Sequence, residues 1–351
     1  MKILVIQQKM IGDVLTSSIL FEALRLKFPK AQLDYLINEH TFPVVKNNPF
    51  IDNFIFFTKE AEASKKNLLK LATSIKKQKY DVVIDVYSKL SSNILTYFSK
   101  AKIKISYHKP YSTSFYTHNI KRKTVTDNLN GLAIENRLQL LKPLGIEASN
   151  LKPKIYLSDD EIKGSKQFLI DNGLNLKKPI LMVSVLGSGE NKTYPLPFMA
   201  KVIDTIYNQT NGQILFNYIP EQKDQATEIF NLCNEKTKSA IFLDVFGKSL
   251  REFLAITHHC SAVIGNEGGA INMAKALNVK TFALFSPWID KATWNLYEDK
   301  NNTGVHLKDY KPEIYTKPEK TYKKEAKKLY NLFKPELFQD KLIEFLKGFN
   351  F

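Results

Sequence analysis

The sequence of 351 residues contains little cysteine and no long apolar run. Its two cysteines, Cys233 and Cys260, form no motif, so we expect buried thiols in a reducing compartment rather than a disulfide. No apolar run approaches the length of a membrane span, and the chain begins directly with the strand-like MKILVI, with no signal peptide. These absences predict a cytoplasmic protein.

The signatures of several enzyme classes are also missing. The first expected strand-to-helix turn carries Gly12 alone and no GxGxxG, which argues against a dinucleotide-binding half. There is no P-loop lysine after a GxxxxG loop and no GxSxG nucleophile elbow. The six histidines show neither HExxH nor HxH spacing, so we expect no metal site and no cofactor.

Acidic residues are scarce relative to basic ones, with 35 aspartates and glutamates against 51 lysines and arginines, a net charge of +16. This excess points to an anionic partner: nucleic acid, an anionic membrane surface or a phosphorylated substrate. Part of it lies on expected helix faces and only makes the protein soluble. Residues 103–128 interleave basic and tyrosine side chains, and we expect a loop-rich segment on the rim of a ligand cleft. An ordinary exposed loop is an equal alternative.

The sequence alternates strand-like and helix-like patterns in two successive halves. We expect strands at residues 2–6, 33–37 and 80–86, and again at 180–185, 213–218, 240–243, 262–264 and 281–285. This order predicts an α/β protein with two doubly wound, Rossmann-like domains that face a central cleft. We place the domains at residues 1–155 and 156–325, with a linker at 149–157.

Residues 326–351 follow the second half and form a lysine-rich helical segment with one apolar face. We expect this face to pack back on the N-terminal domain. Contact with a membrane surface is the alternative, because amphipathic lysine-rich helices also lie on lipid.

Glycines and polar residues follow the expected strands, at the edge where such sheets bind ligands. In the first half Asp13 follows Gly12, where an aspartate suits either a helix N-cap or a base. In the second half a Gly-Ser-Gly loop at residues 187–189 precedes Lys192, and Glu221 follows the next strand. The Glu267-Gly268-Gly269 turn precedes a helix, whose free N–H groups can bind an anion, although turn geometry alone explains paired glycines equally well. A base facing a phosphate-binding half suits transfer from a nucleotide-activated donor.

Four segments occur in an order that resembles one known family. They are MKILVIQQKMIGDVL, YDVVIDVYSKLSSN, LGSGENKTYP and GKSLREFLAITHHCSAVIGNEGGAINMAKALNVKTFALFSP. Together they resemble the lipopolysaccharide heptosyltransferases, glycosyltransferase family 9, over nearly the whole chain. The resemblance implies a GT-B fold and an inverting, metal-independent glycosyltransferase. The leading expectation is transfer of heptose from ADP-heptose to a lipopolysaccharide core or related cell-surface glycan.

The resemblance also implies partners and roles for the two domains. The N-terminal domain would bind a lipid-linked or phosphorylated glycan acceptor, and the C-terminal domain the nucleotide-sugar donor. We expect a cytoplasmic enzyme, and peripheral association with the cytoplasmic face of the inner membrane stays open.

Individual residues match positions of the family. Asp13 matches the presumed general base, Lys192 the lysine that meets the donor phosphates, and Glu221 an acidic residue at the donor nucleotide. Three residues depart from the usual pattern: Glu267 replaces aspartate, Gly268 replaces a hydroxyl residue and Asn272 replaces histidine. The full expected donor set is Gly187, Ser188, Lys192, Glu221, Glu267, Gly268, Gly269 and Asn272. The expected acceptor set is Gly12, Asp85, Ser88 and Lys109.

Two other readings of the sequence stay open. A sugar-nucleotide epimerase or hydrolase of the same architecture would need no acceptor. A basic nucleic-acid-binding protein would account for the charge of +16, but the sequence contains no known nucleic-acid-binding module, so this alternative ranks last.

Overall fold

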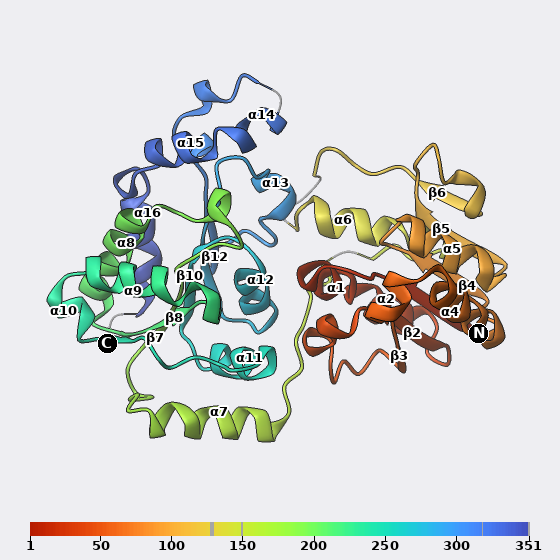
Figure 1. The fold of residues 1–351 in the computed structure, drawn as a ribbon, viewed down its shortest axis with the longest axis horizontal. Coiled ribbons are helices and arrows are strands. Elements are labelled where there is room, and N and C mark those ends of the chain that lie inside the picture. The colour runs from red at the N-terminus through yellow and green to blue at the C-terminus, as the bar shows by residue number, and fades with distance from the viewer. Residues whose placement is uncertain (127–129, 149, 318, 350–351) are drawn as a thin grey trace. The chain divides into compact units, whose positions relative to one another are not determined.

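The computed structural model describes residues 1–126, 130–148, 150–317 and 319–349. The chain folds into two structural units, Met1–Tyr156 and Leu157–Phe351, each built on a six-stranded parallel sheet (Figure 1). The division after Tyr156 falls inside the expected linker and one residue from the expected boundary. Asn128 and Ser149, which limited two of the expected segments, lie outside the described residues.

The sheet of the first unit has the strand order β3-β2-β1-β4-β5-β6. The strand order reverses beside β1, so the loops after β1 and β4 lie at the switch point where doubly wound sheets bind ligands. The strands are β1 (Lys2–Ile6), β2 (Gln32–Ile37), β3 (Asn53–Phe56), β4 (Val82–Asp85), β5 (Ile103–Tyr107) and β6 (His118–Ile120).

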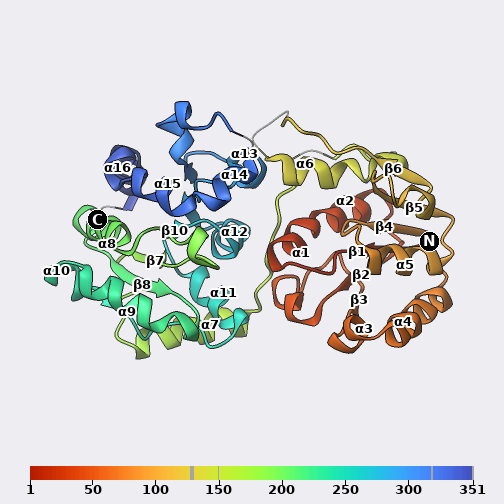
Figure 2. The same cartoon turned by 45° about the horizontal axis from the view of Figure 1, so that its top comes forward.

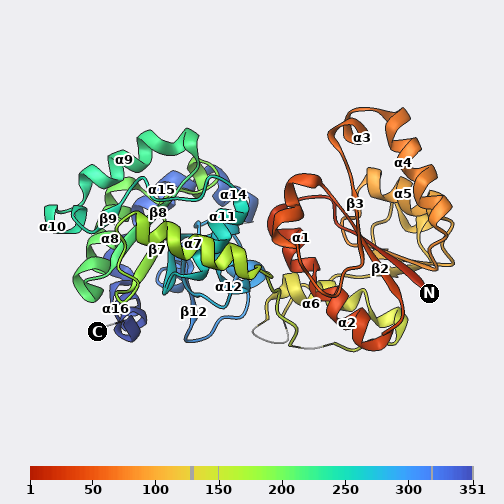
Figure 3. The same ribbon diagram turned by 90° about the horizontal axis from the view of Figure 1, so that it is seen from below.

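Helices cover both faces of this sheet, and Figure 3 separates the two groups. One group is α1 (Ile11–Ser17), α2 (Ile19–Lys27) and α6 (Leu132–Gln139); the other is α3 (Lys59–Ala63), α4 (Lys65–Gln78) and α5 (Leu90–Ser99). Because both faces are covered, the central strands β1 and β4 are mainly apolar, and Leu4 and Val83 are fully buried in the core beneath α4 and α5.

The expectation of a loop-rich segment at residues 103–128 is wrong for its first part. The structure forms β5 and β6 there, joined through a short 3₁₀ helix at Thr113–Phe115. The alternation of Ile103, Ile105 and Tyr107 has the period of two that a strand requires. Tyr107 is buried, and the Arg122 guanidinium lies 3.6 Å from the centroid of its ring. This basic group therefore covers an aromatic side chain of the fold.

The second unit repeats the architecture with the strand order β12-β11-β10-β7-β8-β9. Its strands are β7 (Ile180–Ser184), β8 (Gln213–Asn217), β9 (Ile241–Phe242), β10 (Ala262–Asn266), β11 (Lys280–Leu284) and β12 (Asn302–Val305). Its helices are α7 (Asp159–Asp171), α8 (Leu196–Thr210), α9 (Lys223–Leu232), α10 (Glu235–Lys238), α11 (Leu250–His258), α12 (Gly269–Ala276) and α13 (Lys291–Trp294). Both cysteines are free thiols buried in this unit, as expected.

The C-terminal segment packs on the second unit, so the expectation that it covers the N-terminal domain is wrong. It forms α15 (Ala326–Leu332) and α16 (Gln339–Leu346), which follow α14 (Glu319–Lys324) and are drawn in blue in Figure 2. Phe333 and Phe338 are buried in the core of the second unit and contact the ring of Tyr194, whose hydroxyl donates a hydrogen bond to the Phe333 carbonyl. The apolar face is thereby used within its own unit. No helix in the described part of the chain is long and apolar enough to cross a membrane.

Candidate active site

Asp13 lies in the first turn of α1, just beyond the carboxyl end of β1. The helix begins at Ile11 with Met10 at its N-cap, and no side chain caps it. The alternative that Asp13 is the N-cap is therefore wrong. Its Oδ1 instead accepts a hydrogen bond of 2.6 Å from Nη2 of Arg137.

Arg137 is a residue that the sequence reasoning missed. It projects from α6 with a side chain only 8% exposed, and it also donates from Nε to the Ser17 hydroxyl and from Nη1 to the Ala133 carbonyl. These bonds fix the position of the Asp13 carboxylate. Among the described residues nothing donates a hydrogen bond to Oδ2 of Asp13, and the side chain is 29% exposed. This oxygen can accept a proton from a bound hydroxyl.

Asp85 and Ser88 do not belong to an open acceptor surface, which corrects the expectation for both. Asp85 is fully buried, and its two oxygens accept hydrogen bonds from the Ser88 N–H (2.7 Å) and the Tyr116 hydroxyl (2.6 Å). Burial raises the pKa of Asp85. Ser88 is fully buried as well, and the Lys109 ammonium donates to its carbonyl. Asp85 and Ser88 therefore shape the loop after β4 and cannot touch an acceptor directly.

Gly12 and Lys109 keep some accessible surface. A Cβ atom at Gly12 would meet nothing within 4 Å, so the space beside its Cα is open. Both residues remain candidates for the acceptor side.

In the second unit, the loop after β7 folds back on itself. A Cβ atom at Gly187 would lie 2.2 Å from the Lys192 carbonyl oxygen, so glycine is required there. Gln222 donates from Nε2 to the Gly187 carbonyl (2.9 Å) and ties this loop to the 3₁₀ turn at Pro220–Gln222, which carries the exposed Glu221. Ser188 is exposed at the tip of the loop. The structure thus brings the two expected donor loops together through Gln222.

The start of α12 lies beside this loop. Buried Asn266, the last residue of β10, ties this strand to β7 and to the loop that follows β7: its Oδ1 accepts from the Tyr194 N–H (2.7 Å), and its Nδ2 donates to the Ser184 carbonyl (2.9 Å). Gly268 is the N-cap of α12 with φ 151°, a conformation that favours glycine, and no side chain caps the helix. A Cβ atom at Gly268 would meet nothing within 4 Å. An anion can therefore approach the free N–H groups of this helix.

Glu267 holds a carboxylate in a nearly dry setting at the same edge. Its side chain is 10% exposed, and its Oε1 has no hydrogen-bond partner among the described residues. The Lys192 ammonium lies 3.5 Å from that oxygen. Burial raises the pKa of Glu267, and the positive charge of Lys192 opposes this effect. The pair can meet a hydroxyl-bearing, anionic ligand, because the carboxylate accepts hydrogen bonds and the ammonium meets negative charge. Asn272 follows in the first turn of α12 and is partly exposed.

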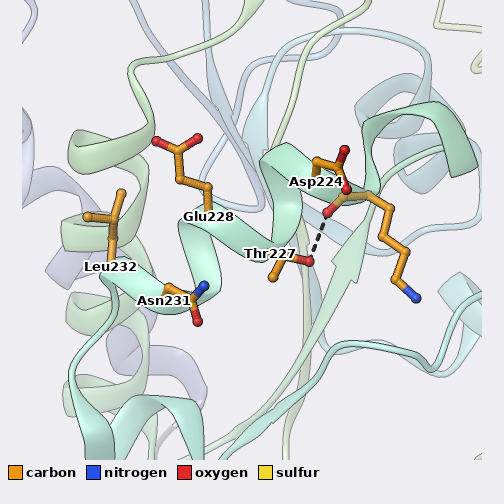
Figure 4. A pocket seen from close by; sticks show the side chains of 6 residues that line it. Asp224, Thr227, Glu228, Asn231 and Leu232 are labelled. Atoms are coloured by element: carbon orange, nitrogen blue, oxygen red, sulfur yellow. Dashed lines mark hydrogen bonds between the residues drawn. The ribbon is translucent and has the colours of Figure 1, made fainter.

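Neither the pocket on α9 nor any cluster of metal-ligating side chains adds a further candidate site among the described residues. A shallow pocket on α9 is lined by Lys223, Asp224, Thr227, Glu228, Asn231 and Leu232 (Figure 4). Its walls come from one helix, and none of the expected site residues lines it. Within the described residues, no three His, Cys, Asp or Glu side chains gather in a way that could hold a metal ion.

The profile of glycosyltransferase family 9 (heptosyltransferase) matches residues 68–323. The chain belongs to glycosyltransferase family 9. The match spans well over half of the sequence and includes the Lys192 loop and the Glu267 turn. The expected family is thereby confirmed, and the protein is a transferase enzyme.

Related sequences and solved structures of similar proteins agree with this family assignment. It is 23% identical over 284 residues to lipopolysaccharide heptosyltransferase 3 of Escherichia coli, covering 78% of this chain and 80% of the relative. The structure of a family 9 glycosyl transferase from Veillonella parvula DSM 2008 has a TM-score of 0.73 at 18% identity, covering 94% and 97% of the two chains. An E. coli heptosyltransferase with ADP-2-deoxy-2-fluoro heptose has a TM-score of 0.64 at 15% identity, covering 87% and 93%. These structures confirm the expected GT-B fold.

Proposed function

We propose that this family 9 enzyme transfers a sugar from a nucleotide-sugar donor to a hydroxyl of a lipopolysaccharide core or related cell-surface glycan, with inversion and without a metal ion. The observation that carries the proposal is the Lys192–Glu267 pair, 3.5 Å apart, beside the uncapped start of α12. This edge offers a cation, free N–H groups and a carboxylate, which suit a diphosphate and a sugar. ADP-heptose is the preferred donor because a solved relative holds an ADP-heptose analogue.

In the proposed reaction, an acceptor hydroxyl attacks the anomeric carbon of the donor from the side opposite the diphosphate. Asp13 takes the hydroxyl proton on Oδ2 while Arg137 holds Oδ1. The bond between the anomeric carbon and the phosphate oxygen breaks, and the diphosphate leaves with the electron pair. Lys192 and the N–H groups at the start of α12 stabilise its negative charge, the role that a divalent cation has in other enzymes.

The remaining donor contacts follow from the same placement. Glu267 accepts hydrogen bonds from hydroxyls of the donor sugar, and Glu221 meets the nucleoside. Ser188, Gly268, Gly269 and Asn272 form the surface around the diphosphate, and the expected Gly187 acts only through the shape of its loop, because it is buried and its N–H and carbonyl bond Thr193 and Gln222. The longer carboxylate of Glu267 and the absent hydroxyl at Gly268 change this surface from the usual family pattern. The glycosyltransferase activity is therefore better supported than heptose as the sugar.

The charge distribution supports an anionic acceptor on the first unit. This unit has 25 lysines and arginines against 12 aspartates and glutamates, whereas the second unit has 26 against 23. Most of the excess positive charge, +13 of +16, thus belongs to the unit that carries Asp13. We propose a phosphorylated or lipid-linked glycan acceptor and peripheral attachment to the inner membrane, because each basic residue near an anionic surface contributes about 1 kcal/mol.

A donor panel tests the function. The purified enzyme is incubated with ADP-heptose, and in parallel with ADP-, UDP- and GDP-hexoses, with and without a lipopolysaccharide core acceptor. We expect release of nucleoside diphosphate from ADP-heptose that depends on the acceptor. Consumption of the donor at full rate without acceptor would instead identify an epimerase or hydrolase.

Vesicle binding tests the membrane attachment separately. We expect co-sedimentation with anionic vesicles at low salt, and release at 0.5 M salt, because screening weakens the attraction. Equal, negligible binding to neutral and anionic vesicles would leave the charge as a solubility feature.

A further inference from the structure

Trp288 follows β11 and stands beside the loop that carries Lys192. Its indole Nε1 donates a hydrogen bond of 2.7 Å to the carbonyl of Asn191, and the Ser286 hydroxyl donates to the same carbonyl at 2.7 Å. Two donors thus fix the peptide group directly before Lys192. Two hydrogen bonds to one carbonyl restrict the backbone at this point, so the Cα atom of Lys192 is held in a fixed position.

Two ammonium groups lie near the same indole ring. The Lys192 Nζ lies 5.7 Å from the ring centroid, and the Lys323 Nζ lies 5.1 Å from it. Both distances are within the range of cation–π attraction. Lys323 comes from α14, far from Lys192 in sequence, so the ring of Trp288 brings together cations from two parts of the second unit.

The two cations differ in how much of their charge is already balanced. Lys192 lies beside the carboxylate of Glu267, whereas Lys323 is exposed and has no described carboxylate within 4.0 Å. A diphosphate that leaves with more than one negative charge is balanced poorly by Lys192 alone. A second ammonium on the same ring, with no carboxylate of the described residues beside it, supplies further positive charge.

We propose that Lys323 is a second diphosphate-binding cation of the donor site, and that Trp288 is the positioning residue that holds it near Lys192. The inference rests on the proposed function. The probes for its test are ADP and inorganic pyrophosphate, and pyrophosphate needs no assumption about the nucleoside or the sugar.

The test compares Lys323→Met with Lys324→Met in the full-length enzyme by titration calorimetry. Lys324 is the exposed neighbour on the same helix and serves as the matched control. We expect Lys323→Met to weaken the binding of both probes roughly tenfold, as loss of one partly screened charge predicts, and to reduce the salt dependence of the Kd. Lys324→Met should stay within about twofold of the wild type.

The role of Trp288 is tested by a double-mutant cycle. Trp288→Leu removes the ring and should weaken probe binding at least as much as Lys323→Met. Adding Lys323→Met to Trp288→Leu should then have little further effect, because the ammonium has already lost its support. Fully additive losses would overturn the positioning role.

The outcomes separate this inference from the proposed function. If Lys323→Met binds ADP and pyrophosphate as tightly as the wild type, the second cation is overturned while the glycosyltransferase function stands. If the wild type binds pyrophosphate but not ADP, the ADP assignment fails, and the Lys323→Met comparison with pyrophosphate still decides the inference. If the wild type binds neither probe, both the inference and the donor site of the proposed function are overturned.

Discussion

Replacing Asp13 by asparagine separates a catalytic carboxylate from a structural one. Asparagine has nearly the same shape, and its side-chain oxygen can still accept the hydrogen bond from Nη2 of Arg137. The amide cannot take a proton from an acceptor hydroxyl. The substitution therefore removes the charge and the basicity but keeps the contact.

Asp13→Asn should have a small effect on stability and a large effect on turnover. A hydrogen bond to a charged group contributes about 1.5–3 kcal/mol and a neutral one about 0.5–1.5 kcal/mol, so the weaker bond to the buried Arg137 should cost about 1 kcal/mol. In a protein of this size that loss lowers the Tm by only a few degrees. Loss of the general base should instead reduce turnover about 10²- to 10⁴-fold.

Both quantities are measured on the same preparation, by thermal unfolding and by acceptor-dependent release of the nucleoside diphosphate. Asp52→Asn is the matched control, because Asp52 also accepts from an arginine, Nη2 of Arg25 at 2.8 Å, within the same unit. The control should show a comparable loss of stability and normal turnover. A stable Asp13→Asn enzyme with the wild-type transfer rate would remove Asp13 from the mechanism.

Three further substitutions test the second unit. Burial raises the pKa of Glu267 above its ordinary value of 4.5, so ionisation of this carboxyl costs stability as the pH rises. The Tm of Glu267→Gln should therefore decline less between pH 4 and 7 than the Tm of the wild type. An unchanged decline would contradict the raised pKa. Burial lowers the pKa of His306 from 6.5 to about 4, so stability is lost as the pH falls through this window, by up to about 3 kcal/mol. The Tm of His306→Asn should not show this loss when it is measured at decreasing pH. A fall of Tm identical to that of the wild type would refute the lowered pKa of His306. Gly187→Ala places a methyl group against the Lys192 carbonyl and should cost roughly 1–3 kcal/mol of stability and weaken pyrophosphate binding, and normal values for both would show that the loop adapts freely.

The sequence predicted well those features that depend on local pattern. Apolar runs such as residues 262–264 mark buried parallel strands, and glycines after them mark the edge where ligands bind. The placement of Lys192 and Glu267 at one edge follows from this rule. The strands β5 and β6 escaped notice because the apolar residues of β5 stand among basic and tyrosine side chains and β6 is only three residues long with one apolar side chain. Only the neighbouring strands make them part of a sheet.

Features that depend on distant partners could not be predicted. Arg137 reaches Asp13 across 124 positions of sequence, and the signal was only an arginine on the apolar face of α6. Asp85 looked like a ligand residue because it lies at the carboxyl end of a strand, but the Tyr116 hydroxyl and the Ser88 N–H donate hydrogen bonds to its two oxygens. The apolar face of α16 predicts that this helix packs against another part of the protein, but it does not identify which unit provides the contact.

The most direct test of the central claim is the configuration of the transferred sugar. The enzyme is incubated with ADP-heptose and acceptor in the presence of EDTA, and the product is examined by nuclear magnetic resonance. We predict acceptor-dependent transfer at an undiminished rate, with the anomeric configuration inverted relative to the donor. Retention of configuration, or transfer that stops in EDTA and returns with added metal, would contradict a reaction in which Asp13 supplies the base and Lys192 the cation.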